Sequence, residues 1–255
     1  MRNIKLLIEY KGTNYHGWQR QKNGNTLQGI IEDKLSEITR EAVKLVGASR
    51  TDAGVHAFGQ VASFRTDSHL DTPIFRRALN ALLPDDIRIL DAEDANEDFH
   101  PRFSAISKSY FYIINNADVS SAFIYRYSWR APYLLDLEIM KKAGAILQGR
   151  HDFSAFRGAG CGAKNTMREI ISLDIDMLNR IDFMTTGFTG RFIKIRIEAN
   201  AFLRHMVRNI VGTLVEIGRG KMTSDSMLKA FELKDRRLMG ITAPANGLFL
   251  EEVRY

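Results

Sequence analysis

The segment ASRTDAGVHA, residues 48–57, places an arginine, an aspartate and a histidine close together and separates them with small side chains. Arg50 precedes Asp52 by two positions and Gly54 follows it by two, so a ligand or a backbone segment can approach the carboxylate closely. A carboxylate in such a place can act as a nucleophile, and an adjacent cation keeps it ionised against desolvation. A solvated turn would have the same composition.

Two other uses of such residues do not fit this sequence. Aspartic proteases work with two aspartates that share a proton, and Asp52-Ala53-Gly54 has no counterpart in the second half. The six histidines show no metal-ligand spacing, and the single cysteine, Cys161, excludes a cysteine-rich zinc site. We therefore expect no bound metal, and we expect Asp52, if catalytic, to act as a lone carboxylate.

The glycine-rich stretch 158–165 has the outline of a phosphate-binding loop without its chemistry. Ala163 stands where the motif needs glycine, and Asn165 stands where it needs a magnesium-binding hydroxyl. The stretch also precedes an expected strand, whereas a phosphate-binding loop leads into a helix. We interpret it as a flexible surface loop, and nucleotide hydrolysis is excluded.

Composition and charge predict a soluble chain with a basic surface. Its 255 residues are 45% hydrophobic, and 36 basic against 30 acidic side chains give a net charge of +6. A positive excess favours a polyanionic partner. No apolar run approaches the roughly 20 residues of a membrane span, and no signal-peptide stretch follows Met1. We therefore expect a soluble, cytoplasmic protein.

The hydrophobic pattern predicts interleaved strands and helices in both halves. Strict alternation, as in Ile193, Ile195 and Ile197, is typical of a strand with one solvent-facing side. In the first half we expect strands at 4–10, around 61–64, at 87–90 and at 107–115, and helices at 27–38 and 75–83. In the second half we expect helices at 136–147, at 202–217 and after Thr223, and strands at 172–177, 192–199 and 248–253.

These elements predict an α+β fold of two units with similar plan, fused through one sheet. Strands with one wet face indicate a mixed or antiparallel sheet rather than a buried parallel one. The pattern is weakest at 117–133, which is the candidate boundary. We therefore expect an N-terminal half at 1–116 with the aspartate loop, and a C-terminal half at 130–255 with a basic helix.

The helix expected at 202–217 has one apolar and one basic face. Arg204 and Arg208 lie on the basic face, where a cation would suit the task of keeping Asp52 ionised. The other members of this face are His205 and Asn209. Basic residues in such positions are also commonly just solvated.

Three groups combine aromatic and basic side chains, which unstacked RNA bases and their phosphates require. They are Tyr15, His16, Trp18, Gln19, Arg20 and Lys22; Lys108, Tyr110 and Tyr112; and Phe153, Phe156 and Arg157. Taken singly, each group equally fits the edge of a hydrophobic core.

Together these segments resemble the TruA-type tRNA pseudouridine synthases. The matching segments are RTDAGVHA at 50–57, YKGTNYHGWQRQ at 10–21, FHPRF at 99–103, KSYFYI at 108–113, DFSAFR at 152–157 and ANAFLRHMVRNIVG at 199–212. They occur in order along essentially the whole chain, so the resemblance is specific.

The resemblance implies a role for four residues. Asp52 matches the family's catalytic aspartate, and Arg50 matches an arginine that enters the helical stack as the target base flips out. Tyr110 matches a tyrosine that packs against the target uracil, and Arg208 matches the basic partner that holds the aspartate ionised. The small residues around Asp52 would then let the sugar and the base reach it.

The resemblance also implies an architecture and a substrate. Family members have two similar α/β halves that form a continuous, largely antiparallel sheet, with helices packed on one side and a basic cleft between the halves. They act on tRNA as homodimers, without metal or cofactor, and isomerise uridines at positions 38, 39 and 40 of the anticodon stem-loop.

Two other functions stay open from the residues alone. A non-catalytic RNA-binding module would keep the same basic and aromatic groups, and an aspartate-dependent nucleosidase or glycosylase would need a similar carboxylate. The presence of Arg50 and Arg208 with Asp52 favours catalysis over binding alone. Whether the carboxylate attacks the sugar C1′ or the base C6 is not decided by the sequence.

Overall fold

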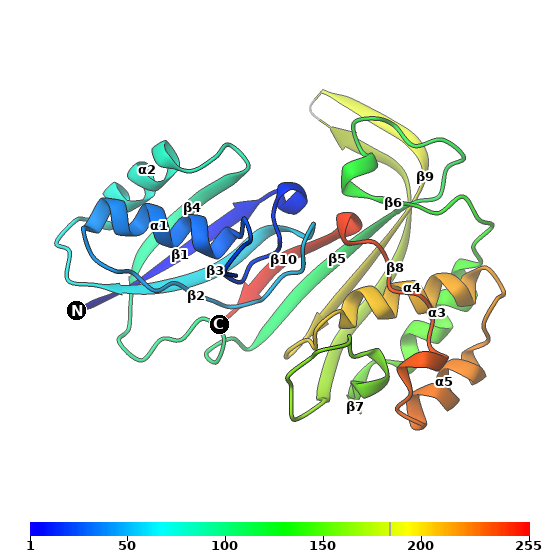
Figure 1. Cartoon of the computed structure of the whole chain (residues 1–255). Coiled ribbons are helices and arrows are strands. Elements are labelled where there is room, and N and C mark those ends of the chain that lie inside the picture. The colour runs from blue at the N-terminus through cyan, green and yellow to red at the C-terminus, as the bar shows by residue number, and fades with distance from the viewer. Residues whose placement is uncertain (184) are drawn as a thin grey trace. The chain divides into compact units, whose positions relative to one another are not determined.

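The computed structural model describes residues 1–183 and 185–255, which form five α-helices and mixed β-sheet (Figure 1). The α+β class expected from the sequence is confirmed. The chain divides into two compact units: unit 1 contains Met1–Lys108 and Phe249–Tyr255, and unit 2 contains Ser109–Leu248. No helix in the described part of the chain is long and apolar enough to cross a membrane.

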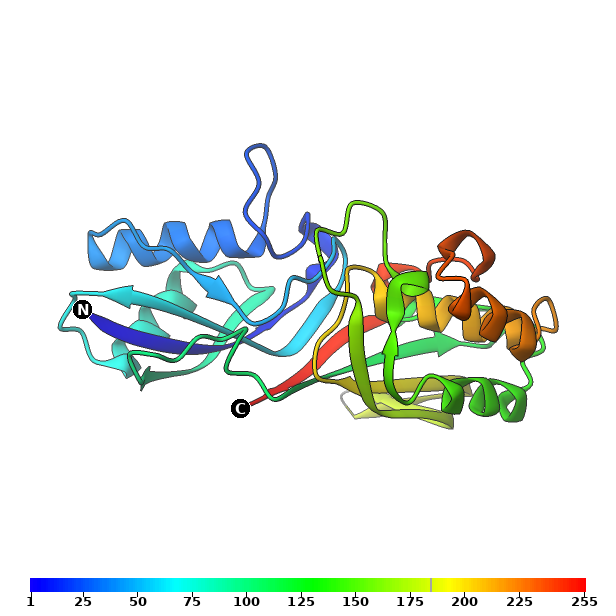
Figure 2. The same ribbon diagram turned by 90° about the horizontal axis from the view of Figure 1, so that it is seen from below.

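Unit 1 consists of a sheet and two helices. Its strands are β1 (Arg2–Tyr10), β2 (Val46–Gly47), β3 (His56–Thr66), β4 (Ile87–Ala95) and β10 (Leu248–Arg254, the first residue of which belongs to unit 2), and its helices are α1 (Leu27–Thr39) and α2 (Thr72–Leu82). The strand order is β4-β1-β3-β10, with β2 also paired to β3. β1 runs antiparallel to β3 and β4, whereas β10 runs parallel to β3. α1 contacts α2 and lies over one face of these strands (Figure 2).

The core of unit 1 is built on the side chains that β1 turns inward. Ile4, Leu6 and Ile8 are fully buried, as their alternation with other residues predicts. Phe75 of α2 packs edge-on against Phe64 of β3, with ring centroids 5.4 Å apart. The helix layer and the sheet therefore share one hydrophobic core.

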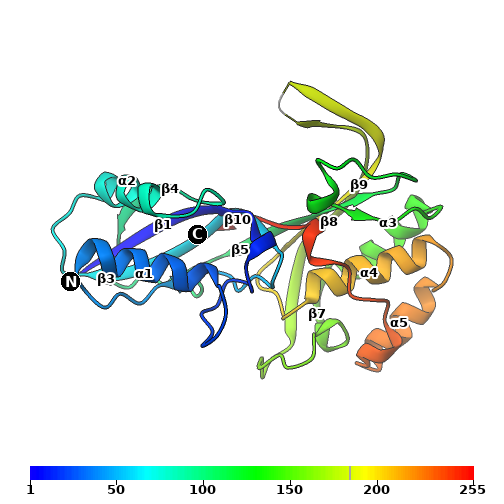
Figure 3. The ribbon, with the colours of Figure 1, turned by 45° about the horizontal axis from the view of Figure 1, so that its top comes forward.

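Unit 2 has a second set of strands and three helices. Its strands are β5 (Ser107–Asn115, the first two residues of which belong to unit 1), β6 (Trp129–Arg130), β7 (Gly149–Asp152), β8 (Met167–Phe183) and β9 (Thr186–Ala199). Its helices are α3 (Leu137–Ile146), α4 (Met206–Gly218) and α5 (Ser224–Glu232). The order is β5-β9-β8-β7, with β6 beside β5. The antiparallel pair β8 and β9 extends beyond the helices of this unit (Figure 3).

Two of the predicted helix starts are confirmed by their caps. The Asp136 carboxylate accepts a hydrogen bond from the Ile139 N–H at 3.1 Å, before α3. At α5, Thr223 and Ser226 form a reciprocal capping box. In both helices a short polar side chain satisfies backbone donors that the first turn leaves unpaired.

The start predicted for α4 is wrong. The helix begins at Met206 rather than at residue 202, because His205 adopts the left-handed conformation with φ 62°. Arg204 and His205 consequently lie in the connection that precedes the helix, and the Arg204 carbonyl oxygen accepts a hydrogen bond from the Gly158 N–H at 2.8 Å. Arg208 remains on the helix, in its first turn.

The segment 240–243 crosses α4 with the two backbones in contact. A Cβ atom added to Gly212 would lie 1.8 Å from the carbonyl oxygen of Ile241. Gly240 faces α4 in the same way, since a Cβ there would lie 2.6 Å from the Cα of Thr213. Both positions therefore require glycine for this close approach.

Gly212→Ala should destabilise the protein although alanine is the better helix former. Helix propensity favours alanine by about 1 kcal/mol, but the added Cβ overlaps the Ile241 backbone, and overpacking of this kind costs about 1–3 kcal/mol or more. We expect a lower free energy of unfolding in urea. Gly162→Ala, whose Cβ would meet nothing within 4 Å, is the control. Equal stability of the two variants would contradict the contact.

Candidate active site

Asp52 lies on the loop 48–55 between β2 and β3, called the Asp52 loop below. The Val55 N–H donates to the Asp52 carbonyl oxygen at 3.2 Å, and Gly54 has φ +81°, so residues 52–55 form a tight turn. Asp52 is half-buried at this turn and Arg50 is exposed. The structure thus places both residues on one loop, with the carboxylate partly shielded from water.

The segment 11–18 lies against the backbone of the Asp52 loop. A Cβ on Gly12 would lie 1.9 Å from the Val55 carbonyl oxygen, and a Cβ on Gly17 would lie 2.8 Å from the Thr51 carbonyl oxygen. Gly17 also has φ +90°, a conformation that other residues rarely adopt. The Trp18 N–H donates to the Thr51 carbonyl oxygen at 3.0 Å. Backbone contacts thus fix the loop on both sides of Asp52.

Side chains fix the same loop at its ends. The hydroxyls of Tyr10 and Thr51 are hydrogen-bonded at 2.7 Å in the interior. The Gln60 amide donates to the Ser49 carbonyl oxygen at 2.7 Å and its oxygen accepts from the Ser49 N–H at 3.2 Å. Tyr10 of β1 and Gln60 of β3 thus both form hydrogen bonds to the loop. Because of these bonds, the backbone that carries Asp52 has little freedom to move.

Sequence reasoning missed Tyr10 and Gln60 as contributors to this site. Gln60 is fully buried within β3, where the neighbouring inward positions are small or apolar. A buried amide needs hydrogen-bond partners, so a glutamine inside an apolar strand pattern is the signal that could have pointed to the loop. Tyr10 gave no such signal, since its ring simply continues the apolar face of β1.

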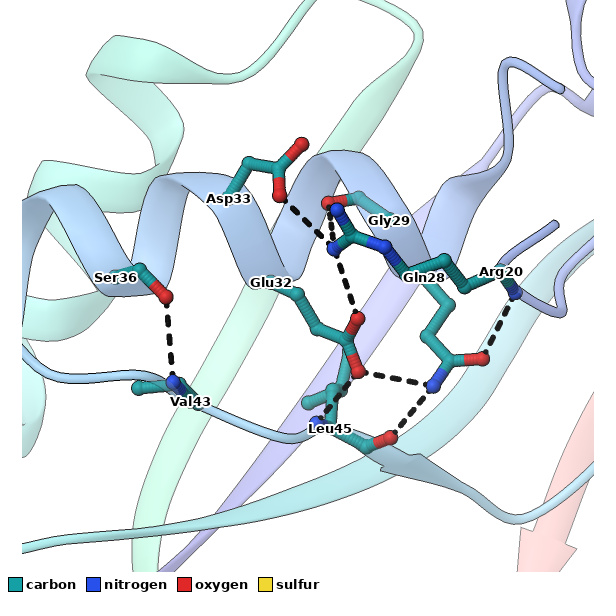
Figure 4. Close-up of polar contacts among 8 residues, drawn as sticks. All are labelled: Arg20, Gln28, Gly29, Glu32, Asp33, Ser36, Val43 and Leu45. Carbon is teal, nitrogen blue, oxygen red and sulfur yellow. Dashed lines mark hydrogen bonds and ion pairs between the residues drawn. The ribbon is translucent and has the colours of Figure 1, made fainter. Parts of the chain in front are cut away.

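The buried carboxylate of Glu32 on α1 binds two other segments of unit 1, one at Arg20 and one at Leu45, just before β2 (Figure 4). Glu32 accepts hydrogen bonds from the Leu45 N–H at 2.9 Å, from the Gln28 amide at 2.9 Å and from the Arg20 guanidinium at 3.1 Å. Arg20 also pairs with Asp33 at 2.9 Å. The two chain segments that converge on the loop are therefore held to one helix.

Tyr15 and Trp18 are scaffold residues, so their interpretation as a stacking platform for RNA bases is wrong. The Tyr15 hydroxyl donates to Asp86, and burial together with that carboxylate raises the pKa of Tyr15. The Trp18 indole lies on Gly47, where an added Cβ would lie 2.4 Å from Nε1. The exposed members of this group are His16, Gln19, Arg20 and Lys22.

In unit 2, Tyr110 lies in β5 and is buried. Its ring packs edge-on against Phe202, with centroids 5.0 Å apart and an interplanar angle of 83°. This contact fixes the plane of the Tyr110 ring. Phe202 belongs to the connection before α4, not to the helix as the sequence pattern suggested.

Arg208 is held by the segment that crosses α4. Its Nε donates to the Ala243 carbonyl oxygen at 2.8 Å, and its own carbonyl oxygen accepts from the Ala243 N–H at 3.0 Å. The nearby Tyr112 hydroxyl donates to the Pro244 carbonyl oxygen at 2.7 Å. Burial raises the pKa of Tyr112, and the Arg208 charge opposes that rise. The guanidinium therefore has a defined place within unit 2.

The four predicted site residues fall into two sets, Arg50 and Asp52 in unit 1 and Tyr110 and Arg208 in unit 2.

Phe153, Phe156 and Asn209 are core residues, which corrects two expectations. Both phenylalanines are fully buried around Phe231, with centroids 5.3 and 5.6 Å from its ring, so they offer no stacking surface to RNA. Asn209 was expected on a solvent-facing side of the helix, but it is fully buried and its amide donates to the Phe156 carbonyl oxygen at 2.7 Å.

The chain is similar to known protein sequences along its whole length. A family model described as tRNA pseudouridine synthase matches residues 6–104 and 143–255. The chain is 46% identical to tRNA pseudouridine synthase A of Thermodesulfovibrio yellowstonii and 45% identical to the proteins of the same name from Acetivibrio thermocellus and Geotalea uraniireducens. Each of these alignments covers 100% of both sequences.

The fold and these matches define an α+β enzyme of the isomerase class that acts on tRNA uridine. The chain belongs to the tRNA pseudouridine synthase family. The resemblance inferred from its sequence segments is thereby confirmed.

Gly17→Ala should impair turnover much more than it impairs folding. The added Cβ would press on the backbone of Thr51 and Asp52 from a conformation that alanine disfavours. Misplacement of a reacting group by about 1 Å can cost about 100-fold in rate, so we expect a fall of that order in single-turnover pseudouridine formation.

The matched control for this variant is Gly24→Ala on the same segment, where the Cβ would meet only ordinary contacts at 3.5 Å and beyond. Circular dichroism establishes that both variants are folded. Equal rates for the two would contradict the assigned role of Gly17.

Proposed function

We propose that this chain isomerises uridine to pseudouridine at positions 38, 39 and 40 of the tRNA anticodon stem-loop, with Asp52 as the nucleophile. Family membership supports the reaction and the substrate class. The observation that supports the role of Asp52 is its position on a turn held by backbone contacts on both sides. A nucleophile must be held in one orientation toward the substrate.

The proposed reaction replaces a nitrogen–carbon glycosidic bond with a carbon–carbon one. The Asp52 carboxylate attacks the nucleoside, the N1–C1′ bond breaks, and the detached uracil turns until C5 faces C1′. A C5–C1′ bond then forms, and the bond between the carboxylate oxygen and the nucleoside breaks, which regenerates the Asp52 carboxylate. The proton on C5 leaves, and N1 takes up a proton. Atoms and electrons balance without a further reactant, whether the attack is at the sugar C1′ or at the base C6.

Three further residues have proposed roles. Arg50 is exposed two residues before Asp52 and would occupy the place of the base as it leaves the helical stack. Tyr110 would pack against the uracil with a ring plane that Phe202 already fixes. Arg208 would keep the Asp52 carboxylate ionised, because an opposite charge lowers a carboxyl pKa that desolvation raises.

The proposed architecture extends from each unit to the assembly. We propose two similar halves, 1–116 and 130–255, which share a continuous, largely antiparallel sheet with helices on one side and a basic cleft between them. We further propose a cytoplasmic homodimer that binds one tRNA across both subunits and needs no metal or cofactor. The net charge of +6 supports a polyanionic substrate.

The function is tested with tRNA that carries uridine tritiated at C5. Isomerisation releases tritium to water and converts uridine to pseudouridine in the chain. A nucleosidase would instead release free tritiated uracil, and a non-catalytic RNA-binding module would release neither. Either of these two results would overturn the proposal.

Asp52→Asn should leave the protein folded and able to bind tRNA but without pseudouridine formation. The amide is nearly isosteric with the carboxylate but is neither anionic nor nucleophilic. Tritium release and a filter-binding affinity are measured together on the variant. Asp98→Asn, on an exposed position of the same unit, is the control. Turnover by Asp52→Asn close to that of the control would remove Asp52 from its role.

Arg50→Ala should slow the reaction of a base-paired stem uridine more than that of an unstacked loop uridine. Extrusion from a paired stem costs a few kcal/mol, and a side chain that fills the vacated place matters most where that cost is largest. Single-turnover rates on the two substrates provide the comparison, with Arg77→Ala, exposed on α2, as the control. Equal slowing on both substrates would exclude this role for Arg50.

A further inference from the structure

Lys108, at the start of β5, lies inside the protein rather than on its surface. It is only 6% exposed, although its sequence neighbours had placed it in a group suited to RNA phosphates. Of the two interpretations left open for its group, the edge of a hydrophobic core therefore holds for Lys108, and a contact with RNA phosphates does not. The mechanism proposed above also gives this ammonium no task.

The ammonium of Lys108 is bound to the Asp52 loop. Its Nζ donates to the carbonyl oxygen of Ala48 at 2.5 Å. Ala48 is the first residue of the loop, and its own N–H donates to the Val61 carbonyl oxygen of β3 at 2.8 Å. Lys108 therefore fixes the peptide unit at which the chain leaves the sheet and turns toward Asp52.

Burial of this charge has a cost that an apolar side chain would avoid. Burial, followed by the positive charge of Arg102, lowers the pKa of Lys108 to about 8. The other charged groups on the adjoining segments are Arg50 and Asp52 on the loop and Glu251, Glu252 and Arg254 on β10. The last two are paired at 3.1 Å. A charged donor binds a carbonyl oxygen more strongly than a neutral one. This stronger hydrogen bond to Ala48 offsets part of the cost of burying the ammonium.

We propose that Lys108 is a positioning residue of the isomerisation, whose protonated side chain sets the backbone of the Asp52 loop through the Ala48 carbonyl oxygen. This inference rests on the proposed function. It assigns Lys108 to the chemical step and not to tRNA binding.

The first test compares Lys108→Met with Lys34→Met, a control on the surface of α1. Hydrogen bonds to charged groups are worth about 1.5–3 kcal/mol, which corresponds to about 10- to 100-fold in rate. We expect single-turnover pseudouridine formation at saturating enzyme to fall by that factor in Lys108→Met, with the dissociation constant for tRNA unchanged within about twofold.

The second test uses pH and does not require Lys108→Met to fold. The wild-type single-turnover rate should fall as the pH rises through about 8, because the protonated ammonium is the stronger donor to the carbonyl oxygen. Lys108→Arg keeps its charge throughout this range. Its rate should therefore stay level between pH 7 and 9, where the wild-type rate falls.

Several results would overturn the inference. They are a folded Lys108→Met as fast as Lys34→Met, a loss of tRNA affinity in place of rate, a wild-type rate that stays level across pH 8, or an alkaline fall that persists in Lys108→Arg. Failure of the proposed function itself is distinct from all of these, since the wild-type protein would then release no tritium from C5-labelled tRNA.

Discussion

The position of Asp52 depends on glycines that lie directly against the backbone of its loop. Gly12 and Gly17 approach Val55 and Thr51 so closely that no Cβ atom fits between the chains. Sterics of this kind are stiffer than side-chain hydrogen bonds, because overlapping backbone atoms have no rotamer into which they can move. The segment 11–18 therefore acts as a fixed support, and the hydrogen bonds from Tyr10 and Gln60 add to a loop that is already shaped.

Two buried charged side chains of unit 1, Glu32 and Lys108, form hydrogen bonds to the backbone at or near the start of the Asp52 loop. Glu32 binds the Leu45 N–H in the segment that leads into the loop, and Lys108 binds the carbonyl oxygen of Ala48, the first residue of the loop. Each such bond aligns a peptide unit that apolar packing alone would leave free to rotate. The half-buried Asp52 is thus presented from a backbone that is fixed both by close packing and by charged hydrogen bonds.

Local signals predicted much of the fold. The alternation of β1, the limits of β5 and the cap at Asp136 depend on neighbouring residues, so the sequence pattern contains them. The start of α4 could not be found this way, because His205 is an ordinary residue in a left-handed conformation held by the surrounding structure. The parallel pairing of β10 with β3 at Phe249 and His56 was hidden too, since it joins segments far apart in the chain.

The sequence predicted the residues of the candidate site but not the residues that hold the Asp52 loop in place. A resemblance of short segments pointed to Asp52 because the types and spacing of residues are local features. For Trp18 and Lys108 the sequence could not decide between RNA contact and the edge of the core, because aromatic and basic side chains have the same local pattern whether they face solvent or a glycine such as Gly47. Whether a side chain is buried depends on parts of the chain that are distant in sequence. The local pattern of a single sequence therefore does not predict it.

Whether unit 1 holds the Asp52 loop in one conformation without tRNA is measured by hydrogen exchange at single amides of the free protein. The decisive amides are those of Trp18, which donates to Thr51, and of Val55, which donates to Asp52. If the loop is held in this way, both amides are protected to the same degree as the amides between β1 and β3. Exchange of these two amides at the rate of an open loop, with β1 and β3 protected, would contradict it.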